Sequence, residues 1–327
     1  MRDVALPAGH PSLPSISVVI CAYTDARWDD LCAAIASVHG QRQPAHQLIL
    51  VIDHNERLHD RAAREIEGVV LTENSEQRGL SGARNSGVRV ATGDVVAFMD
   101  DDAYAEPDWL GNIAAAYADP SVLAVGGAII PAWEEARPAW WPDEFDWVIG
   151  CTYRGMPATR AAVRNMIGCN MSFRRETFEE VGGFPHGIGR IGSRPLGGEE
   201  TELCIRALRR WPDRQILYEP AASVHHRVPP ARGTFRYFRS RCYSEGLSKA
   251  AISRLVGSGS ALSTERSYTM RTLTRGVRRN VADGARHPRG GGMRRAAAIV
   301  AGLTTTTAGY VVGRIRHPRE KQPGTRQ

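Results

Sequence analysis

The sequence predicts an α/β fold with a mainly parallel β-sheet flanked by helices, followed by a helical, basic C-terminal extension. Apolar, β-branched runs that are typical of buried parallel strands alternate with segments of helical periodicity. Two of these runs end in aspartates. The charge also changes sign along the chain, since residues 266–327 carry +12 and residues 1–265 carry −5 of the total +7. An acidic globular body with a basic appendage follows from these observations.

The first hundred residues predict four strands and three helices. Ile16 to Ala22 is a nearly continuous β-branched run, and comparable runs follow it. We expect strands at 16–22, 47–52, 69–71 and 95–99, and helices at 28–39, 57–67 and 82–90. Open parallel sheets bind ligands at the carboxyl ends of their strands, so Asp53 and the run Asp100-Asp101-Asp102 should share one rim.

The middle of the chain changes character between residues 131 and 155. It is rich in tryptophan and proline, with Trp133, Trp140, Trp141 and Trp147 in irregular structure. Two interpretations are open: an insertion that shapes a substrate site, or a cover over the sheet edge. Helical periodicity returns at 201–210 and 232–250.

Length and composition restrict the class of protein. With 327 residues the chain holds one large domain with an appendage, or two domains. A 42% hydrophobic and 24% charged composition excludes overall disorder, collagen and coiled coil. The six cysteines form no CxxC pair, which disfavours zinc ribbons and redox dithiols. Residues 1–13 are expected to be flexible and contain no apolar signal core, so we expect a cytoplasmic protein with reduced, mostly buried cysteines.

The C-terminal region, 251–327, combines basic residues with one uncharged stretch. Ala296 to Gly313 is 18 residues long and is bracketed by arginines. A membrane-spanning helix needs about 20 apolar residues, so an interfacial or re-entrant contact is favoured over a span. Flanking cations are attracted to an anionic leaflet by about 1 kcal/mol each. We therefore expect peripheral attachment at the inner face of the cell membrane, with an ordinary helix packed on the catalytic domain as the alternative.

The aspartate run after the fourth strand points to a metal site. Three adjacent carboxylates repel one another unless a hard divalent cation, which prefers oxygen ligands, lies among them. Such an ion could stabilise a departing diphosphate as a Lewis acid. The alternative is an acidic turn, because aspartate is common in turns.

Two further segments carry chemistry. The first, Gly197 to Leu203, places two glycines before three glutamates at a helix start. The helix dipole explains one acid there, and a carboxylate beside a sugar hydroxyl could act as a general base.

The second segment, Arg78 to Gly87, combines glycines, arginines and a helix start, which suits a phosphate-bearing ligand. It is neither a GxGxxG fingerprint nor a P-loop, which disfavours dehydrogenases and NTPases.

Six segments in order resemble family 2 glycosyltransferases over roughly residues 14–250. They are SVVICAYT, VIDHN, NSEQRGLSGARNSGV, VVAFMDDDAYAEPDWL, GCNMSFRRETFEEVGGFP and GGEETELCIRAL. The tryptophan-rich centre and the segments VRNMIGCNMSFRR and FRSRCYSEGLSKA are similar to actinobacterial and haloarchaeal members, some labelled dolichyl-phosphoglucose glucuronosyltransferases. The resemblance implies a GT-A fold over 14–250 and inverting transfer from a nucleotide-diphosphate sugar, with UDP the commonest nucleotide.

The resemblance also implies roles for individual residues. The nucleotide sugar would contact residues at the strand ends and in the arginine loop: Ala22, Tyr23, Asp53, Arg78, Arg84, Asp100 and Asp101. Asp102 would be the direct ligand of Mn²⁺ or Mg²⁺, with Asp100 or Asp101 on the ribose or a metal-bound water, and Asp100 is also a candidate metal ligand. The acceptor would border Gly168, Cys169 and Asn170.

The catalytic base is implied at Glu200. The family's usual Glu-Asp pair is Glu-Glu here, so the longer side chain either reaches a more distant acceptor or shares the role with Glu199. His226 could complete the metal site, against the commoner capping histidine. The cluster Arg232, Arg236, Arg239 and Arg241 is directed at a donor diphosphate or a polyprenyl-phosphate-linked glycan, or is a solvated helix face.

Two other functions compete with this prediction. A sugar nucleotidyltransferase would carry a glycine-rich, lysine-containing loop after the first strand, where this chain has CAYTDARWDD. A non-catalytic nucleotide- or nucleic-acid-binding protein would suit the basic tail and the arginine- and aromatic-rich stretch 232–243. The acidic body and the triple aspartate disfavour it, and no nucleic-acid partner is expected.

Overall fold

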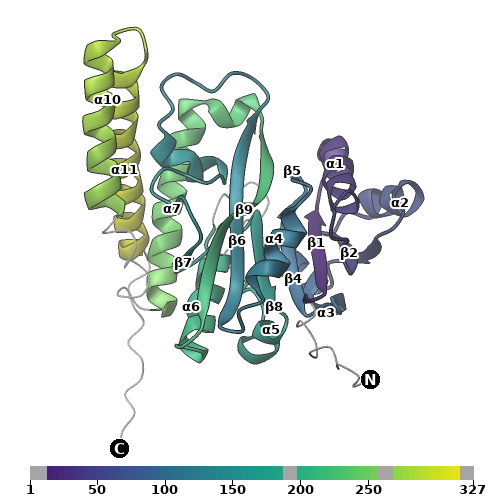
Figure 1. The fold of residues 1–327 in the computed structure, drawn as a ribbon. Coiled ribbons are helices and arrows are strands. Elements are labelled where there is room, and N and C mark those ends of the chain that lie inside the picture. Colours follow the sequence, from purple (N-terminus) through teal and green to yellow (C-terminus); the bar gives the residue numbers. More distant parts are fainter. Residues whose placement is uncertain (1–12, 187–196, 257–267, 317–327) are drawn as a thin grey trace, which may run out of the picture.

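The computed structural model describes residues 13–186, 197–256 and 268–316, and shows helices packed around one mixed β-sheet (Figure 1). Nearly all of the expected flexible segment 1–13 lies outside the described residues. The sheet has the strand order β3-β2-β1-β4-β8-β6-β9-β5, with β7 also paired to β9. The α/β class predicted from the sequence is therefore confirmed.

The N-terminal half is the predicted parallel array. Its strands are β1 (Ile16–Ala22), β2 (Gln47–Ile52), β3 (Val70–Glu73) and β4 (Val95–Asp100), all parallel to their neighbours within this group. The connecting helices are α1 (Trp28–His39), α2 (Glu56–Glu65) and α3 (Leu80–Val90). Val18 packs into the core on one face of the sheet and Val19 into the core on the other. Burial of both faces explains why these strands are continuously apolar.

The second half of the sheet is not parallel throughout. Its strands are β5 (Ala103–Ala105), β6 (Val122–Trp133), β7 (Ala161–Val163), β8 (Asn170–Arg174) and β9 (Gln215–Val228). Strand β8 runs antiparallel to β4 and β6, and β5 and β7 run antiparallel to β9, while β6 and β9 are parallel. The mainly parallel sheet we expected is thus a mixed one.

Pairing of β5 with β9 brings distant residues to the rim of the sheet. The register aligns Ala103 with His226, and the amide of Arg227 donates to the carbonyl of Asp102 at 2.9 Å. Since Asp102 directly precedes β5, this pairing fixes His226 beside the aspartate run.

The remaining helices pack around the sheet, and α10 and α11 lie outside α7 on one side of the molecule (Figure 1). They are α4 (Trp109–Ala116), α5 (Glu176–Val181), α6 (Glu199–Arg210), α7 (Phe235–Val256), α10 (Thr274–Arg286) and α11 (Gly292–Arg316). Shorter turns are η1 (Asp25–Arg27), η2 (Asp143–Ile149), η3 (Pro230–Gly233) and η4 (Tyr268–Leu273). Helices α10 and α11 form a hairpin beside α7. Because α7 continues past residue 250, the expected domain boundary falls inside a helix.

The tryptophan-rich segment packs on α7 and also reaches a cavity. Trp140 and Trp141 pack edge-on against Phe238 of α7 at centroid distances of 5.5 and 5.4 Å, and Trp141 is buried. Trp147, in η2, instead lines the large cavity described below. The segment therefore contributes to the protein core and also lines the cavity, while a part in shaping a substrate site stays a prediction.

Helix α11 packs directly onto α7 through glycines. A Cβ atom at Gly246 would lie 2.1 Å from the carbonyl oxygen of Thr306, and one at Gly309 would lie 2.1 Å from that of Tyr243. No other residue type allows so close an approach of two backbones. Within the described residues α11 is the one helix long and apolar enough to cross a membrane, with mean hydropathy 1.4 and 33% of that window buried.

All six cysteines are free thiols. Cys151, Cys169, Cys204 and Cys242 are buried, and the other two are half-buried. The expectation of unpaired, mostly buried cysteines is confirmed.

Candidate active site

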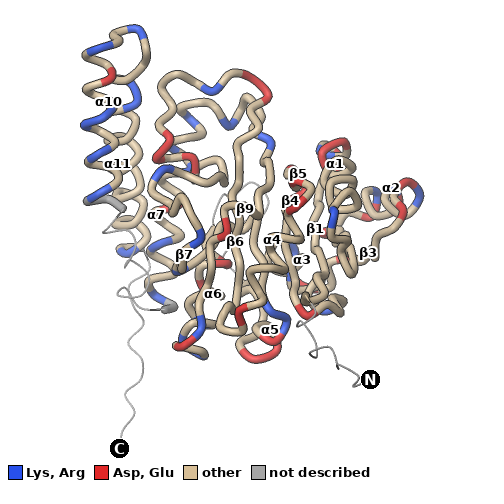
Figure 2. Tube along the Cα trace, in the orientation of Figure 1, with Lys and Arg blue, Asp and Glu red and all other residues tan. Residues whose placement is uncertain are grey.

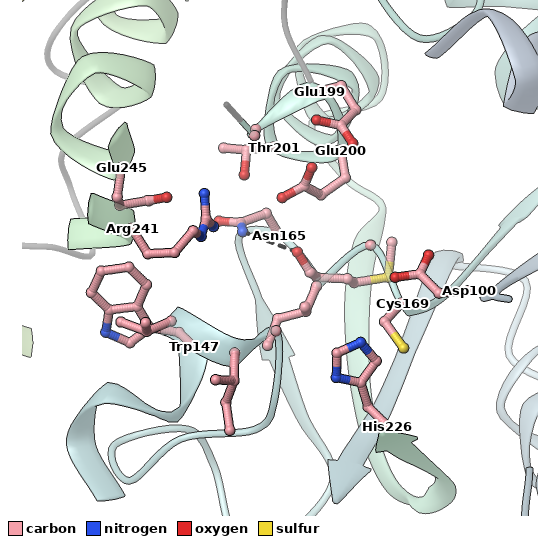
Figure 3. A pocket seen from close by; sticks show the side chains of 18 of the residues that line it. Asp100, Trp147, Asn165, Cys169, Glu199, Glu200, Thr201, His226, Arg241 and Glu245 are labelled. Atoms are coloured by element: carbon pink, nitrogen blue, oxygen red, sulfur yellow. Dashed lines mark hydrogen bonds between the residues drawn. The ribbon is translucent and has the colours of Figure 1, made fainter. Parts of the chain in front are cut away.

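One cavity of about 1380 Å³ opens at the carboxyl ends of β1, β2 and β4. It collects nearly all the residues selected from the sequence: Ala22, Tyr23, Asp53, Arg78, Arg84, Asp100, Asp101, Asp102, Gly168, Cys169, Glu199, Glu200 and His226. Figure 3 shows that Glu199 and Glu200 enter it from one side, and Asp100, Cys169 and His226 from another.

The aspartates at the end of β4 are paired with arginines. Arg27 of η1 lies 2.6 Å from Asp101 and 3.4 Å from Asp102. Its guanidinium also lies over the ring of Tyr23, 5.2 Å from the centroid. The site therefore balances buried negative charge with a cation from the loop after the first strand, as buried charges require.

Asp102 is the most strongly held of the three aspartates. His226 lies 3.2 Å from it and Arg232 of η3 lies 3.0 Å from it. Burial opposes its ionisation, but His226, Arg232 and Arg27 together hold the pKa of Asp102 well below its ordinary range. Asp102 is therefore an anion at neutral pH.

The donor atoms beside Asp102 suit a divalent metal. One ligand atom each of Asp100, Cys169 and His226 lies within 4.8 Å of the others, and Asp102 adds a carboxylate 3.2 Å from the imidazole. Among the described residues, the buried Oδ2 atom of Asp101 lacks a hydrogen-bond partner. Carboxylate and imidazole donors fit Mn²⁺, so these residues match a metal-ion site in composition.

Glu199 and Glu200 begin helix α6 and lie in different electrostatic surroundings. Gly198 before them has φ 105°, which only glycine adopts readily, and a Cβ there would lie 2.3 Å from Ile252. Glu199 is buried and paired with Arg84 at 2.9 Å. Burial, and then the charge of Glu199, raise the pKa of Glu200 to about 8. Glu200 can therefore take up a proton near neutral pH.

Arg84 connects three parts of the site. It is 2% exposed, and besides Glu199 it donates to the carbonyl of Gly168 at 3.0 Å and lies 3.5 Å from Asp100. The sequence suggested that Arg84 contacts the nucleotide-sugar donor directly. The structure gives Arg84 a place in the cavity wall and pairs its guanidinium with protein groups, so it holds the start of α6 against the aspartate run.

Asp53 is also hydrogen-bonded to other groups of the protein. Its carboxylate accepts from the Asn74 amide at 2.7 Å and from the backbone amide of Gly79 at 3.0 Å. These bonds fix the loop that precedes α3, at the point where Arg78 is exposed at the cavity. Asp53 thus holds this loop in place while it lines the cavity.

Asn170 does not line the cavity, contrary to the acceptor role we expected for it. Its side chain is buried, accepts from the Trp109 indole at 2.9 Å, and donates to the carbonyls of Ala128 and Ala222 at 2.9 and 2.8 Å. The carboxamide holds β8, β6 and β9 together. Gly168 and Cys169, just before it, remain at the cavity.

The predicted arginine cluster divides into two pairs. Arg232 and Arg241 line the cavity, whereas Arg236 and Arg239 are exposed to solvent. The solvated-face interpretation therefore fits Arg236 and Arg239, and a phosphate-directed role stays a prediction for Arg232 and Arg241.

Sequence reasoning missed Arg27 and the C-terminal wall of the cavity. Arg27 follows the first strand closely, so its position at the same rim as Asp101 was a usable signal. Apart from Arg241, which belongs to the predicted arginine cluster, the contribution of α7, η4 and α11 had no comparable signal, because it depends on how the C-terminal helices dock. The wall contains Tyr237, Arg241, Glu245, Lys249, Ile252, Thr272, Leu273, Leu303, Thr306, Thr307 and Tyr310.

Comparisons with known proteins agree with this geometry. The glycosyl transferase family 2 model matches residues 17–182. The chain is 37% identical over 244 residues to a glucosyl-dolichyl phosphate glucuronosyltransferase of Haloferax volcanii, covering 73% of this chain and 78% of that protein.

Solved structures of the same architecture include two glycosyltransferases. A mannosyltransferase of Pyrobaculum calidifontis, solved with GDP-mannose and Mn²⁺, has a TM-score of 0.55 at 17% identity and matches 90% of this chain and 87% of its own. GalNAc-T7, solved with UDP, GalNAc and Mn²⁺, has a TM-score of 0.52 at 19% identity and matches 75% of this chain and 51% of its own. These similarities show the GT-A fold. The chain belongs to glycosyl transferase family 2 and is a glycosyltransferase.

Proposed function

We propose that the protein is a metal-dependent, inverting transferase that moves a sugar from a nucleotide diphosphate to a hydroxyl of a polyprenyl-phosphate-linked sugar. One observation carries the proposal: a single cavity holds the Asp102–His226 pair at the sheet rim and Glu200 at the start of α6. The first suits a metal and a diphosphate, and the second suits an acceptor hydroxyl.

The reaction follows from these positions. Glu200, as carboxylate, takes the proton of the acceptor hydroxyl. The hydroxyl oxygen forms a bond to C1 of the donor sugar, while the bond from C1 to the phosphate oxygen breaks and the nucleoside diphosphate leaves with that electron pair. Because attack and departure are on opposite faces of the sugar, the anomeric configuration inverts. A raised pKa makes the ionised Glu200 a stronger base.

The leaving diphosphate needs positive charge on the opposite side of the cavity. Asp102 and His226, with Asp100 nearby, would hold Mn²⁺ or Mg²⁺, which supplies Lewis-acid stabilisation of the leaving group. Arg78 is exposed at the donor loop and Arg232 borders Asp102, so both can face phosphate oxygens. Preorganised charges of this kind account for a large part of enzymatic rate enhancement.

The acceptor class is inferred from the relative of Haloferax volcanii, whose name specifies a glucosyl-dolichyl phosphate acceptor. The match covers 73% of this chain and 78% of that protein. A glycosyl polyprenyl phosphate has a sugar hydroxyl for Glu200, a phosphodiester and a long apolar chain. The nucleotide of the donor is open, and UDP is our first expectation.

We further propose that the protein binds the cytoplasmic face of the membrane peripherally. Apolar side chains of α11, among them Val300 and Ile315, are exposed at 51% and 71%. Arginines gather along α10 (Figure 2), and among them Arg275 and Arg278 are exposed. An apolar strip with neighbouring cations suits an anionic lipid surface.

Vesicle flotation tests this attachment. We expect the protein to float with vesicles containing anionic phospholipid and to be released as salt rises, because salt screens exposed charges. Exchanging Arg275 and Arg278 for Ser should weaken binding, whereas Arg57→Ser on α2, on the opposite side of the molecule (Figure 1), should not. Equal flotation with purely zwitterionic vesicles would exclude an electrostatic contribution.

A thermal-shift panel tests the donor and the metal together. UDP, GDP, CDP and dTDP are each added with Mn²⁺ or with EDTA. We expect one nucleotide to raise Tm in the presence of Mn²⁺ alone, since a ligand at 100 times its Kd stabilises a protein by about 2.7 kcal/mol.

Two variants locate the effect. Asp102→Asn should lose the metal-dependent shift, because it removes the charge at the proposed metal site. Asp60→Asn, on the exposed face of α2, should retain it. A nucleotide shift that persists in EDTA, or in Asp102→Asn, would contradict the metal-dependent donor site.

A further inference from the structure

The cavity that contains Glu200 extends to the C-terminal helices. There its wall comes from one face of α7 and one face of α11. On α7 the lining positions recur at helical spacing, and on α11 they span two turns: Tyr237, Arg241, Glu245, Lys249 and Ile252, and Leu303, Thr306, Thr307 and Tyr310. The basic C-terminal region is therefore a wall of the catalytic cavity.

This wall is fixed in place. The glycine contacts of Gly246 and Gly309 hold the two helix backbones together, and Arg254 of α7 donates to the carbonyl of Gly313 at 2.9 Å. Glu144 of η2 pairs with Arg279 of α10 at 2.8 Å and joins the hairpin to the tryptophan-rich segment. A rigid surface can recognise a ligand without first being ordered.

The charges on this wall suit a phosphodiester. Arg241 and Lys249 lie on the same face of α7, with Glu245 between them and 3.5 Å from Lys249, so the three side chains sum to +1. Figure 3 shows Arg241 and Glu245 extending from α7 into the space that Glu200 and Thr201 face. The charge of Glu245 contributes to the raised pKa of Glu200, which places the two carboxylates within electrostatic range.

Uncharged residues of α7, η4 and α11 complete this wall. Ile252, Leu273 and Leu303 line it, and Thr306 and Tyr310 present small or amphipathic surface. Thr306 and Tyr310 belong to α11, and the outer face of this helix exposes Val300 and Val311. An apolar chain leaving the cavity here would follow a helix that is itself apolar on its exposed side.

We propose that the wall formed by α7 and α11 is the binding site for the phosphate and lipid of the acceptor. This assignment rests on the proposed function. The phosphodiester of the acceptor would bind to Arg241 and Lys249. The first isoprenoid units would lie against Leu303, Thr306 and Thr307. The acceptor sugar then lies between the phosphodiester and Glu200. Charge-assisted hydrogen bonds from Arg241 would position the acceptor.

Steady-state kinetics with two acceptors tests this assignment. One is a short-chain polyprenyl phosphate carrying a single sugar, and the other is a neutral alkyl glycoside of the same sugar. For Arg241→Ala we expect KM for the phosphate-linked acceptor to rise about tenfold or more, because hydrogen bonds to charged groups contribute on that scale. KM for the neutral glycoside should change little. Arg241→Lys should recover part of the loss.

Further variants separate recognition from folding. Arg239→Ala, on the same helix but exposed to solvent, is the matched control and should keep the wild-type preference. Thr307→Trp places a large ring in the proposed lipid path, and should raise KM more for longer chains than for shorter ones. Melting temperatures and nucleotide affinity in the presence of Mn²⁺ check that each variant is folded with an intact donor site.

The outcomes distinguish this inference from the proposed function. If the wild type transfers to neither acceptor, the proposed function fails. If the wild type transfers, but Arg241→Ala affects both acceptors equally or behaves like Arg239→Ala, the function stands and this acceptor site is wrong. Equal effects of Thr307→Trp on short and long chains would overturn the lipid path.

Discussion

Glu200→Gln should reduce kcat by about 10²- to 10⁴-fold, the usual contribution of a general base. The substitution preserves size and hydrogen bonding but cannot accept the acceptor proton. Because Glu200 does not touch the Asp102–His226 pair in the structure, nucleotide affinity should remain close to that of the wild type. Initial rates at saturating donor and acceptor provide the measurement.

The pH profile makes this prediction specific. The base must be ionised to act, so kcat/KM of the wild type should rise with pH and level off above an apparent pKa of about 8.

The free energy of unfolding should fall as the pH rises over the same region. The folded protein retains a proton that the unfolded chain releases at its ordinary pKa of 4.5, so the wild type loses stability between pH 4.5 and 8. Glu200→Gln should lack this loss.

Glu202→Gln is the matched control. It removes a carboxylate from the same helix that pairs with Arg206 at 2.7 Å and does not line the cavity. It should keep most of the turnover and the rising pH limb. Full activity of Glu200→Gln, or loss of activity in both variants alike, would show that Glu200 is not the base.

Arg84→Met should destabilise the fold by about 3–5 kcal/mol, the cost of removing one partner from a buried ion pair. Glu199 would keep its charge in a buried position, and its Oε2 atom already lacks a hydrogen-bond partner among the described residues. The carbonyl of Gly168 would lose its donor as well. The midpoint of urea unfolding at pH 7 measures the effect.

The double variant Arg84→Met, Glu199→Gln separates charge from packing. Removing the uncompensated carboxylate should restore much of the lost stability, because the penalty comes from the unpaired charge. If the double variant is no more stable than Arg84→Met, the loss comes from packing instead, and the ion pair has no special part in holding α6 against the aspartate run.

The parallel half of the fold could be predicted from the sequence because its strands are buried on both faces. Such strands appear as continuous β-branched runs, and three of the four predicted strands match the structure to within one residue. Strands β6 and β9 were missed. They contain glycine, proline and histidine, and their register shifts between Gly127 and Ile129, so neither shows a regular apolar pattern.

The site could be predicted where the residues lie at strand ends or helix starts. Asp102 and Glu200 are of this kind, since topology alone brings both to the cavity. His226 depended on the pairing of β5 with β9, and Asn170 looked like a site residue although its amide joins three strands of the sheet. Local sequence does not show which face of an element a polar side chain occupies.

The packing of the C-terminal hairpin also could not be predicted from local sequence. Its charge and hydropathy suggested a separate membrane-directed appendage, with a helix packed on the catalytic domain as the alternative. Glycines at 246 and 309 bring α11 onto α7, so the packed arrangement is the one observed. The exposed face of α11 remains apolar, and one helix can therefore serve both the cavity and a lipid surface.

The most direct test of the account is a product analysis with the full chain. Sugar nucleotides, Mn²⁺ and a short-chain glycosyl polyprenyl phosphate are incubated with it, and the lipid and nucleotide products are identified by mass spectrometry and NMR. The account predicts a lipid product one sugar larger with inverted anomeric configuration, and one nucleoside diphosphate released for each sugar transferred. Retention of configuration, or release of a sugar 1-phosphate in place of transfer, would contradict it.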